Sequence, residues 1–313
     1  MSKIVILGAG HVGSLCALQL AASGICGEIV LIDIDEKKAD SQAKDVADAT
    51  AFMRRPVNVH AGTYQDCDDA DILVISVGVS RKPGQTRLDM LGDTIDIMKD
   101  VVGKLKQTKF HGIIISISNP CDIVVNYTRK HLGYPAQKIF GTGTSLDTAR
   151  LRRTLHELTG VDMRSIQCFA MGEHGDSSMV PLSHVTLMGK PLTQLMEEHP
   201  ETYGKARLEI LEERTHQIGM EIVIGKGSTE FGIGAAVAEL CQSVLYDERR
   251  VFPVSAYLSG EYGKRDFHAG VPAIIGKNGV EEILTLQLTE SEQAAFDASC
   301  DVIQKHNELA EAR

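Results

Sequence analysis

Residues 3–13 read Lys-Ile-Val-Ile-Leu-Gly-Ala-Gly-His-Val-Gly. The first five predict a short buried strand, because four apolar residues in a row precede a glycine. The residues after Gly10 carry apolar side chains at helical spacing, so a helix is expected over 11–23. A glycine-rich turn between a strand and a helix is typical of the start of an open α/β sheet.

This turn matches the pattern G-x-G-x-x-G at Gly8, Gly10 and Gly13, which places the pyrophosphate of a dinucleotide against a helix N-terminus. Gly8 would permit the tight turn, Gly10 would let the backbone approach the phosphates, and Gly13 would let helix and strand pack closely. His11 and Val12 would open the helix, whose free N–H groups face the phosphates. The alternative is a glycine-rich turn that binds nothing.

Asp33 favours the nucleotide over that alternative. It stands twenty residues after Gly13, at the end of the second expected strand, Glu28–Ile32. A carboxylate there accepts hydrogen bonds from the adenosine ribose and repels a 2′-phosphate. The sequence therefore predicts NAD as the cofactor, in preference to NADP.

Short apolar runs alternate with helical patterns through the first half of the chain, as in a parallel sheet covered on both faces. The expected strands are 3–7, 28–32, 57–61, 72–77 and 112–117, and the expected helices are 11–23, 36–52, 88–106 and 122–132. In the second half we expect helices over 145–158, 202–224 and 230–246, strands over 166–171, 184–188, 251–258 and 273–275, and a final helix starting at the capping box 289–292.

These patterns predict an α/β fold with two domains. Residues 1–144 would form a doubly wound, Rossmann-type dinucleotide-binding domain, and residues 145–313 an α+β substrate domain.

Composition argues against several classes of function. The net charge of −10, with no basic run, offers nucleic acid no electrostatic footprint. No apolar run reaches the roughly 18 residues of a membrane span, and no secretory signal is apparent, so a cytoplasmic protein is expected. Seven scattered cysteines without a C-x-x-C pair predict reduced, buried thiols and no metal site.

A catalytic centre is expected around His174, which lies between Gly172 and Gly175 in a loop after an expected strand. Reduction of a 2-keto acid needs a proton donor, and a histidine has a pKa near neutrality. Asp147 and Arg150 are three residues apart on one expected helix and so share a face. Asp147 would fix the tautomer of His174, and Arg150 would hold a substrate carboxylate through two parallel hydrogen bonds.

Arg87 and Asn119 follow two other expected strands, at the carboxyl edge where ligands of open sheets gather. Both would polarise the substrate carbonyl. On spacing alone, surface salt bridges are an equal alternative for this whole set of residues.

The chain resembles the L-lactate/malate dehydrogenase family along essentially its whole length. The matching segments occur in the family's order and spacing, and they are Gly8–Gly13, Asp33, Arg81–Arg87, Ser118–Pro120, Leu146–Arg150 and Gly172–Asp176. The resemblance implies an NAD-dependent L-2-hydroxyacid dehydrogenase. It implies catalytic roles for His174, Asp147 and Arg87, substrate contacts for Arg150, Arg81, Asn119 and Thr229, and a cofactor contact for Asn119. It also implies a segment, 81–93, that closes over a 2-keto or 2-hydroxy acid, and a homo-oligomer, a tetramer built from dimers.

Two residue patterns in the sequence point to different substrates. In the family, lactate enzymes carry glutamine where Arg81 stands, and malate enzymes carry arginine. Arginine would pair with the second carboxylate of oxaloacetate, which is costly to bury alone. The alternative is a solvated Arg81 on an exposed loop, which would not distinguish one substrate from another. Gly172–Asp176 and Lys226–Thr229, in contrast, resemble lactate enzymes. We expect malate as the favoured substrate, with lactate as the alternative.

The resemblance also raises the question of a regulator, and two rival functions stand against the dehydrogenase. Some bacterial lactate enzymes bind a sugar bisphosphate through an arginine and a histidine; Arg152 matches the first, but Gln167 stands in place of the second, so weak or no activation is expected. A non-catalytic NAD sensor would not need His174, Asp147, Arg150 and Arg87 together. An NAD-dependent glycosidase on a related fold would need a metal, for which no ligand set is evident.

Overall fold

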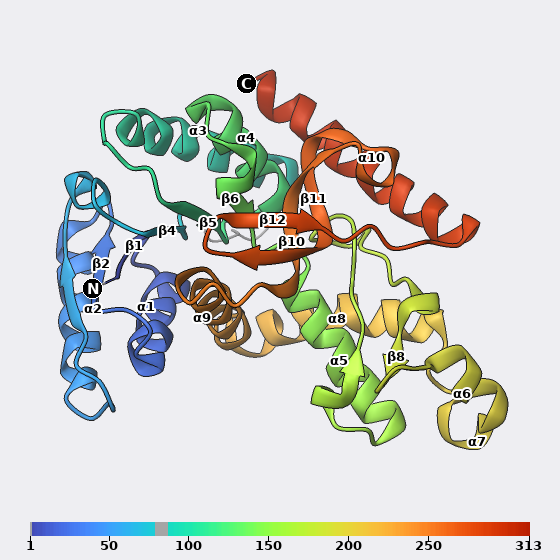
Figure 1. Cartoon of the computed structure of the whole chain (residues 1–313). Helices are drawn as coiled ribbons and strands as arrows, with labels where there is room; N and C mark the ends of the chain where they lie inside the picture. The colour runs from blue at the N-terminus through green and yellow to red at the C-terminus, as the bar shows by residue number, and fades with distance from the viewer. Residues whose placement is uncertain (1, 79–86) are drawn as a thin grey trace.

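A computed structural model describes residues 2–78 and 87–313 (Figure 1). A nine-stranded sheet crosses the molecule in the order β12-β11-β10-β6-β5-β4-β1-β2-β3. Its parallel part is built from β1 (Lys3–Leu7), β2 (Glu28–Ile32), β3 (Asn58–Ala61), β4 (Ile72–Ile75), β5 (Ile113–Ser116) and β6 (Ile139–Gly141). Because β1 pairs with both β2 and β4, the winding direction reverses there, and ligands of such sheets bind beside that switch.

Helices cover both faces of this sheet. The N-terminal half supplies α1 (His11–Ser23), α2 (Glu36–Thr50), α3 (Arg87–Leu105) and α4 (Cys121–Leu132). Helix α1 packs against α2, and α3 packs against α4. Figure 1 shows α3 and α4 above the sheet and α1 below it. The α/β, doubly wound architecture expected from the sequence is therefore confirmed.

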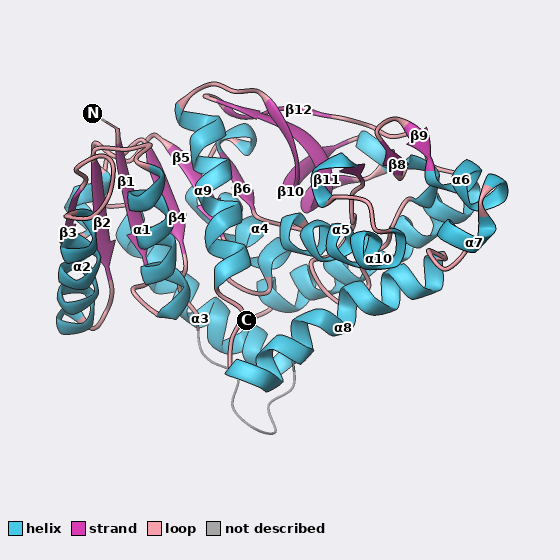
Figure 2. Ribbon diagram, turned by 90° about the horizontal axis from the view of Figure 1, so that it is seen from below, coloured by secondary structure: helices cyan, strands magenta, loops and turns pink. Residues whose placement is uncertain are grey.

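The C-terminal half extends the sheet with antiparallel strands. Strands β10 (Arg250–Ser259), β11 (Arg265–Gly276) and β12 (Gly279–Ile283) pair in sequence order, and β10 meets β6 where Ser255 lies opposite Gly141. Figure 2 shows these strands in the middle of the molecule, between the parallel strands β1 and β2 on one side and β8 and β9 on the other. Three two-residue strands form a second sheet: β7 (Ile166–Gln167), β8 (Thr186–Leu187) and β9 (Lys190–Pro191).

The helices of this half are α5 (Ser145–Thr159), α6 (Leu192–Glu198), α7 (Pro200–Tyr203), α8 (Leu208–Lys226), α9 (Phe231–Leu245) and α10 (Glu290–Glu311). Helix α9 packs against α1 and α10 packs against α4 (Figure 1), while α5 packs against α8 and also contacts β7 of the smaller sheet. The capping box at Thr289 and Glu292 is confirmed, with each side chain accepting the other's backbone N–H.

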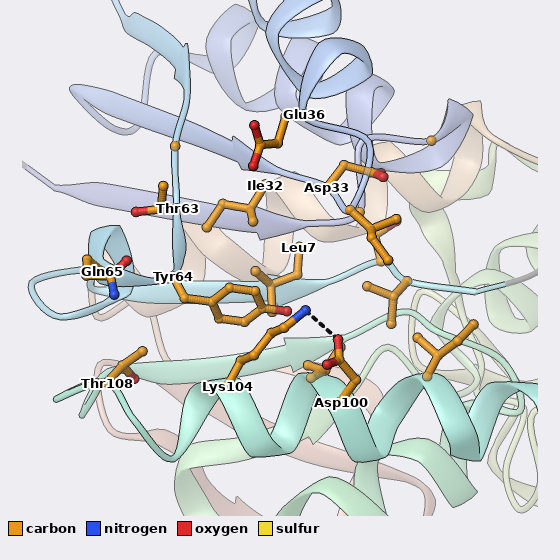
Figure 3. Close-up of a pocket in the computed structure, with 18 of the residues that line it drawn as sticks. Leu7, Ile32, Asp33, Glu36, Thr63, Tyr64, Gln65, Asp100, Lys104 and Thr108 are labelled. Atoms are coloured by element: carbon orange, nitrogen blue, oxygen red, sulfur yellow. Dashed lines mark hydrogen bonds and ion pairs between the residues drawn. The ribbon is translucent and has the colours of Figure 1, made fainter.

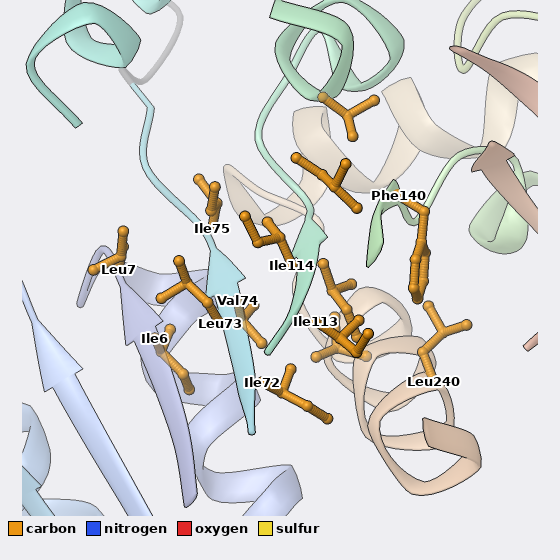
Figure 4. Packing of buried hydrophobic residues seen from close by; sticks show 14 of the residues in the cluster. Ile6, Leu7, Ile72, Leu73, Val74, Ile75, Ile113, Ile114, Phe140 and Leu240 are labelled. Atoms are coloured by element: carbon orange, nitrogen blue, oxygen red, sulfur yellow. The ribbon is translucent and has the colours of Figure 1, made fainter. Parts of the chain in front are cut away.

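Two apolar clusters hold these layers. The larger runs through both halves of the chain and includes Ile72–Ile75 of β4, flanked by Ile6 and Ile114, with Phe140 and Leu240 beyond them (Figure 4). The smaller gathers around Leu151 and Leu155 of α5. Strands buried on both faces need near-continuous apolar runs, which explains why β1 and β4 are so readily seen in the sequence.

Some expected elements are wrong in extent. The single helix expected over 202–224 is instead two helices, since α7 ends at Tyr203 and α8 starts at Leu208. The Gly204 N–H makes the last hydrogen bond of α7, to the Pro200 carbonyl. The strands expected over 166–171 and 184–188 are pairs of residues only. Strands β6, β9 and β12 were not expected, since short segments carry too little periodicity to be recognised.

All seven cysteines are buried and free, as expected. Within residues 2–78 and 87–313, no helix has both the length and the apolar character that crossing a bilayer requires.

Candidate active site

The glycine turn has the geometry that its pattern predicts. Gly8 adopts φ +99°, a left-handed conformation, and a Cβ there would lie 2.4 Å from the Ser76 carbonyl oxygen. A Cβ on Gly13 would lie 1.8 Å from the Gly8 carbonyl oxygen, so only glycine lets α1 approach β1 this closely. A Cβ on Gly10 would meet nothing nearer than 4.0 Å. Gly10 is also the residue that precedes α1, so open space lies beside the free N–H groups of the helix.

A cleft of about 870 Å³ opens at this end of β1, β2 and β4. Gly8, Gly10 and Asp33 line it, together with Tyr64 from the segment after β3 and Lys104 from α3 (Figure 3). Figure 3 shows Tyr64 reaching across the cleft towards Lys104, whose ammonium pairs with Asp100. The volume and the mixed apolar and polar lining suit a nucleotide.

Asp33 is held firmly at the rim of this cleft. Its Oδ2 accepts the Ala9 N–H at 2.7 Å, and its Oδ1 accepts the Asp35 N–H at 3.0 Å. Each carboxylate oxygen has a second lone pair, so hydroxyls of a ribose can still donate to the group. The residue is therefore fixed in place by the same turn that would carry the phosphates.

His174, Asp147 and Arg150 meet in one cluster. Imidazole Nδ1 lies 2.6 Å from Asp147 Oδ2, and Arg150 Nη1 donates to Asp147 Oδ1 at 3.0 Å. Asp147 is 7% exposed and Arg150 12%, whereas the His174 side chain keeps 23% exposure. A carboxylate bound at Nδ1 leaves Nε2 as the atom that can exchange a proton with a substrate.

The charges of this cluster shift the pKa of two members in opposite directions. The pKa of His174 is raised above its usual value, because the negative charge of Asp147 outweighs the effect of burial. Burial alone would raise the pKa of Asp147, but the charge and hydrogen bond of His174, with Arg150, lower it. Both shifts favour the imidazolium–carboxylate pair over its neutral form.

Helix α8 closes the cluster on one side. A Cβ on Gly219 would lie 3.0 Å from the Arg150 guanidinium, so glycine at this position lets the helix pass over the arginine. Nε of Arg150 is buried and has no protein partner. A buried guanidinium that keeps N–H groups free is suited to bind a carboxylate.

For the remaining expected site residues, the structure gives the position in the fold and, for some, the exposure. Asn119 is exposed in the turn between β5 and α4. Thr229 is half-buried in the turn between α8 and α9. Arg87 is the first residue of α3 and its side chain lies outside the described residues, as does the whole of Arg81.

One functional candidate was missed by the sequence analysis. Asp122, the second residue of α4, is 2% exposed and accepts the His174 backbone N–H at 2.8 Å. An acidic residue in the first turn of a helix is usually explained by its favourable interaction with the helix dipole alone. The sole signal was its position two residues after Ser118–Pro120, a segment that carries the family resemblance.

Family models match nearly all of the chain. A model described as the lactate/malate dehydrogenase NAD-binding domain covers residues 2–141, and one described as the lactate/malate dehydrogenase alpha/beta C-terminal domain covers residues 144–313.

The chain belongs to the lactate/malate dehydrogenase family.

Relatives within this family are similar over almost their whole length. The L-lactate dehydrogenase 3 of Bacillus anthracis is 45% identical over 304 residues, which is 97% of this chain and 96% of that relative. The L-lactate dehydrogenase of Fusobacterium nucleatum subsp. nucleatum is 42% identical over 310 residues, covering 99% and 97%. A crystal structure of the minor L-lactate dehydrogenase from Enterococcus mundtii, in a ligands-bound form, matches with a TM-score of 0.95 at 38% identity, covering 100% and 98%.

Membership establishes that this chain is an NAD-dependent oxidoreductase acting on an L-2-hydroxy acid. The glycine turn, the open α1 N-terminus and Asp33 fit NAD, because the negative charge of Asp33 would repel the 2′-phosphate of NADP. When bound, the cofactor supplies or accepts the hydride.

Proposed function

We propose that this protein is an L-lactate dehydrogenase that interconverts pyruvate and L-lactate. The observation that carries the proposal is the cluster of His174, Asp147 and Arg150, which provides a proton donor and a carboxylate clamp within one buried hydrogen-bond network. Full-length relatives named L-lactate dehydrogenase support the choice of pyruvate. The pattern Gly172–Asp176, which resembles lactate enzymes, agrees with it.

The cluster suggests a division of labour in pyruvate reduction. Arg150 binds the substrate carboxylate, and protonated His174 donates from Nε2 to the carbonyl oxygen as the hydride arrives at carbon. Asp147 holds the imidazole through Nδ1 and stabilises its positive charge. We assign Arg87 and Asn119 to the substrate carbonyl, Asn119 also to the cofactor, and Thr229 to the substrate wall.

Malate, the substrate expected from Arg81, has less support than lactate does. Malate remains the second candidate for one reason, which is that an arginine at position 81 would pair the distal carboxylate of oxaloacetate. Residue 81 lies outside the described residues, so this reason rests on the sequence alone.

The deciding experiment compares kcat/KM for NADH oxidation with pyruvate and with oxaloacetate. A preference for pyruvate of about tenfold or more, equal to 1.4 kcal/mol of transition-state binding, supports the proposal. A preference of that size for oxaloacetate makes the protein a malate dehydrogenase. Loss of turnover in His174→Asn with NADH binding retained separates an enzyme from an NAD sensor.

We further propose that the protein is a cytoplasmic homotetramer, and that each subunit has two domains, residues 1–144 and 145–313. We also propose that a sugar bisphosphate activates it weakly or not at all. Gln167 is neutral, and its Oε1 accepts the Thr186 hydroxyl at 2.8 Å, so it offers a phosphate no positive charge. Light scattering tests the assembly. A clear drop in the KM for pyruvate on adding a sugar bisphosphate would contradict the last point.

A further inference from the structure

Asp122 joins three parts of the structure at the active site. Its Oδ2 accepts the His174 backbone N–H at 2.8 Å, and its Oδ1 accepts the hydroxyl of Ser255. Asp122 lies on α4, His174 on the loop that follows β7, and Ser255 on β10. The last two are 52 and 133 residues away from Asp122 along the chain. A single carboxylate therefore ties the backbone of the histidine to both α4 and β10.

Its ionisation depends on those two donors. Burial raises the pKa of Asp122 to about 6, although the hydrogen bonds from Ser255 and from the His174 N–H oppose the rise. The carboxylate is thus mostly charged at neutral pH, and loss of either donor would favour the protonated acid.

The charge on Asp122 also acts on the imidazole. Asp147 has the largest effect in raising the pKa of His174, and Asp122 raises it further, whereas Arg150 lowers it. Among the side chains that the structure describes, further ionisable groups facing this centre are Glu173 on the loop and Cys121, Cys300 and His216 on α4, α10 and α8. Of these, Glu173 adds a negative charge beside Asp122, and His216 faces Asp147.

We propose that Asp122 is a positioning residue for the proton donor: it fixes the backbone of His174 and, as a second carboxylate, helps to keep the imidazole protonated, with Ser255 holding Asp122 in its charged form. The proposal rests on the proposed function, in which His174 gives a proton to the substrate. It goes further in placing control of the histidine on α4 and β10, outside the His174–Asp147–Arg150 cluster.

Two variants probe the two halves of the proposal. Asp122→Asn keeps the shape but removes the charge and one acceptor. Ser255→Ala keeps the carboxylate and removes one donor. Ser243→Ala is a matched control, because the Ser243 hydroxyl is also fully buried and donates to a strand carbonyl, that of Ile275, away from the site.

In Asp122→Asn we expect kcat for pyruvate reduction at pH 7 to fall about tenfold or more, while the dissociation constant of NADH changes less than about twofold. The alkaline limb of the kcat/KM profile moves down by about half a unit, because the neutral amide no longer favours the imidazolium. The acid limb near pH 6 disappears. In Ser255→Ala that acid limb moves up by about one unit, and in Ser243→Ala both limbs stay in place.

A readout without turnover comes from NMR. The imidazole signal of His174, assigned by its loss in His174→Asn, is titrated in the protein without substrate, and its pKa should fall in Asp122→Asn by about half a unit. An unchanged His174 pKa, or a Ser255→Ala profile identical to that of Ser243→Ala, would overturn the proposal and leave Asp122 a purely structural group. If the wild-type protein reduces no 2-keto acid, the proposed function fails, whereas the NMR titration still decides whether Asp122 acts on His174.

Discussion

Imidazole Nδ1 of His174 lies 2.6 Å from Oδ2 of Asp147, although the two residues are 27 positions apart in the chain. One comes from a loop after β7 and the other from the first turn of α5. The same carboxylate binds Arg150, so a single buried oxygen pair orients both the proton donor and the substrate clamp.

Replacing Asp147 should therefore damage turnover more than cofactor binding. In Asp147→Asn the amide can present an N–H to Nδ1 and favour the wrong tautomer, so we expect kcat/KM for pyruvate to fall about a hundredfold or more. NADH affinity should hold within about twofold. Steady-state kinetics and fluorescence titration measure the two quantities. Asp162→Asn, which removes a carboxylate that pairs with Arg164 on the surface, should change neither.

The pH profile follows from the raised pKa of His174. Pyruvate reduction needs the imidazolium, so its kcat/KM should stay high above pH 6.5 and fall as pH rises through the raised pKa. Lactate oxidation needs the neutral imidazole and should rise through the same pH range. Profiles measured in both directions should share this midpoint, and a midpoint well below 6.5 would contradict the assigned role of Asp147.

Asp33 should control the choice of cofactor. Asp33→Asn is expected to raise the KM for NADH about tenfold and to weaken discrimination against NADPH, because a neutral amide no longer repels a 2′-phosphate. The ratio of kcat/KM values for NADH and NADPH is the measurement. Asp35→Asn is the matched control, since Asp35 caps α2 from an exposed position and asparagine caps equally well. Equal ratios in the two variants would count against Asp33.

Two glycines on helices should respond oppositely to alanine. In Gly13→Ala the new Cβ would meet the Gly8 carbonyl oxygen at 1.8 Å, so α1 must move, and we expect several kcal/mol of destabilisation, on the order of an overpacked core, with loss of NADH binding. Gly103 lies on α3 with open space around its Cβ position, and Gly103→Ala should stabilise the fold by about 0.5–1 kcal/mol. Denaturant unfolding followed by circular dichroism compares the two.

Arg81 should set the tolerance for a distal carboxylate. We expect Arg81→Gln to lower kcat/KM for oxaloacetate about tenfold or more and to leave pyruvate less affected, because only oxaloacetate would bury an unpaired charge. Lys82→Gln makes the same change of charge at the adjacent position and serves as the control. Parallel losses for both substrates, or equal effects of the two variants, would show that Arg81 does not select the substrate.

Local sequence was enough to predict the parts of the protein whose physical causes are local. The turn Gly8–Gly13 and the capping box at Thr289 and Glu292 are specified within a few residues, and both have the expected geometry. Buried parallel strands such as β4 leave an unbroken apolar run. The pairing of His174 with Asp147 was also anticipated, because the chemistry of proton transfer asks for a carboxylate behind the histidine.

Tertiary structure alone decided which other carboxylate reaches the histidine. Asp122 stands two residues after the matching segment Ser118–Pro120, and Glu173 stands inside Gly172–Asp176, so nothing local distinguishes them. Asp122 is selected because β10 joins the parallel sheet at β6 and brings the Ser255 hydroxyl across 133 residues to its carboxylate. Such pairings depend on the register and packing of distant strands, which local propensity does not encode. The sequence therefore determined the glycine turn, the buried parallel strands and the reacting groups, whereas the fold determined the contacts of Asp122 with His174 and Ser255.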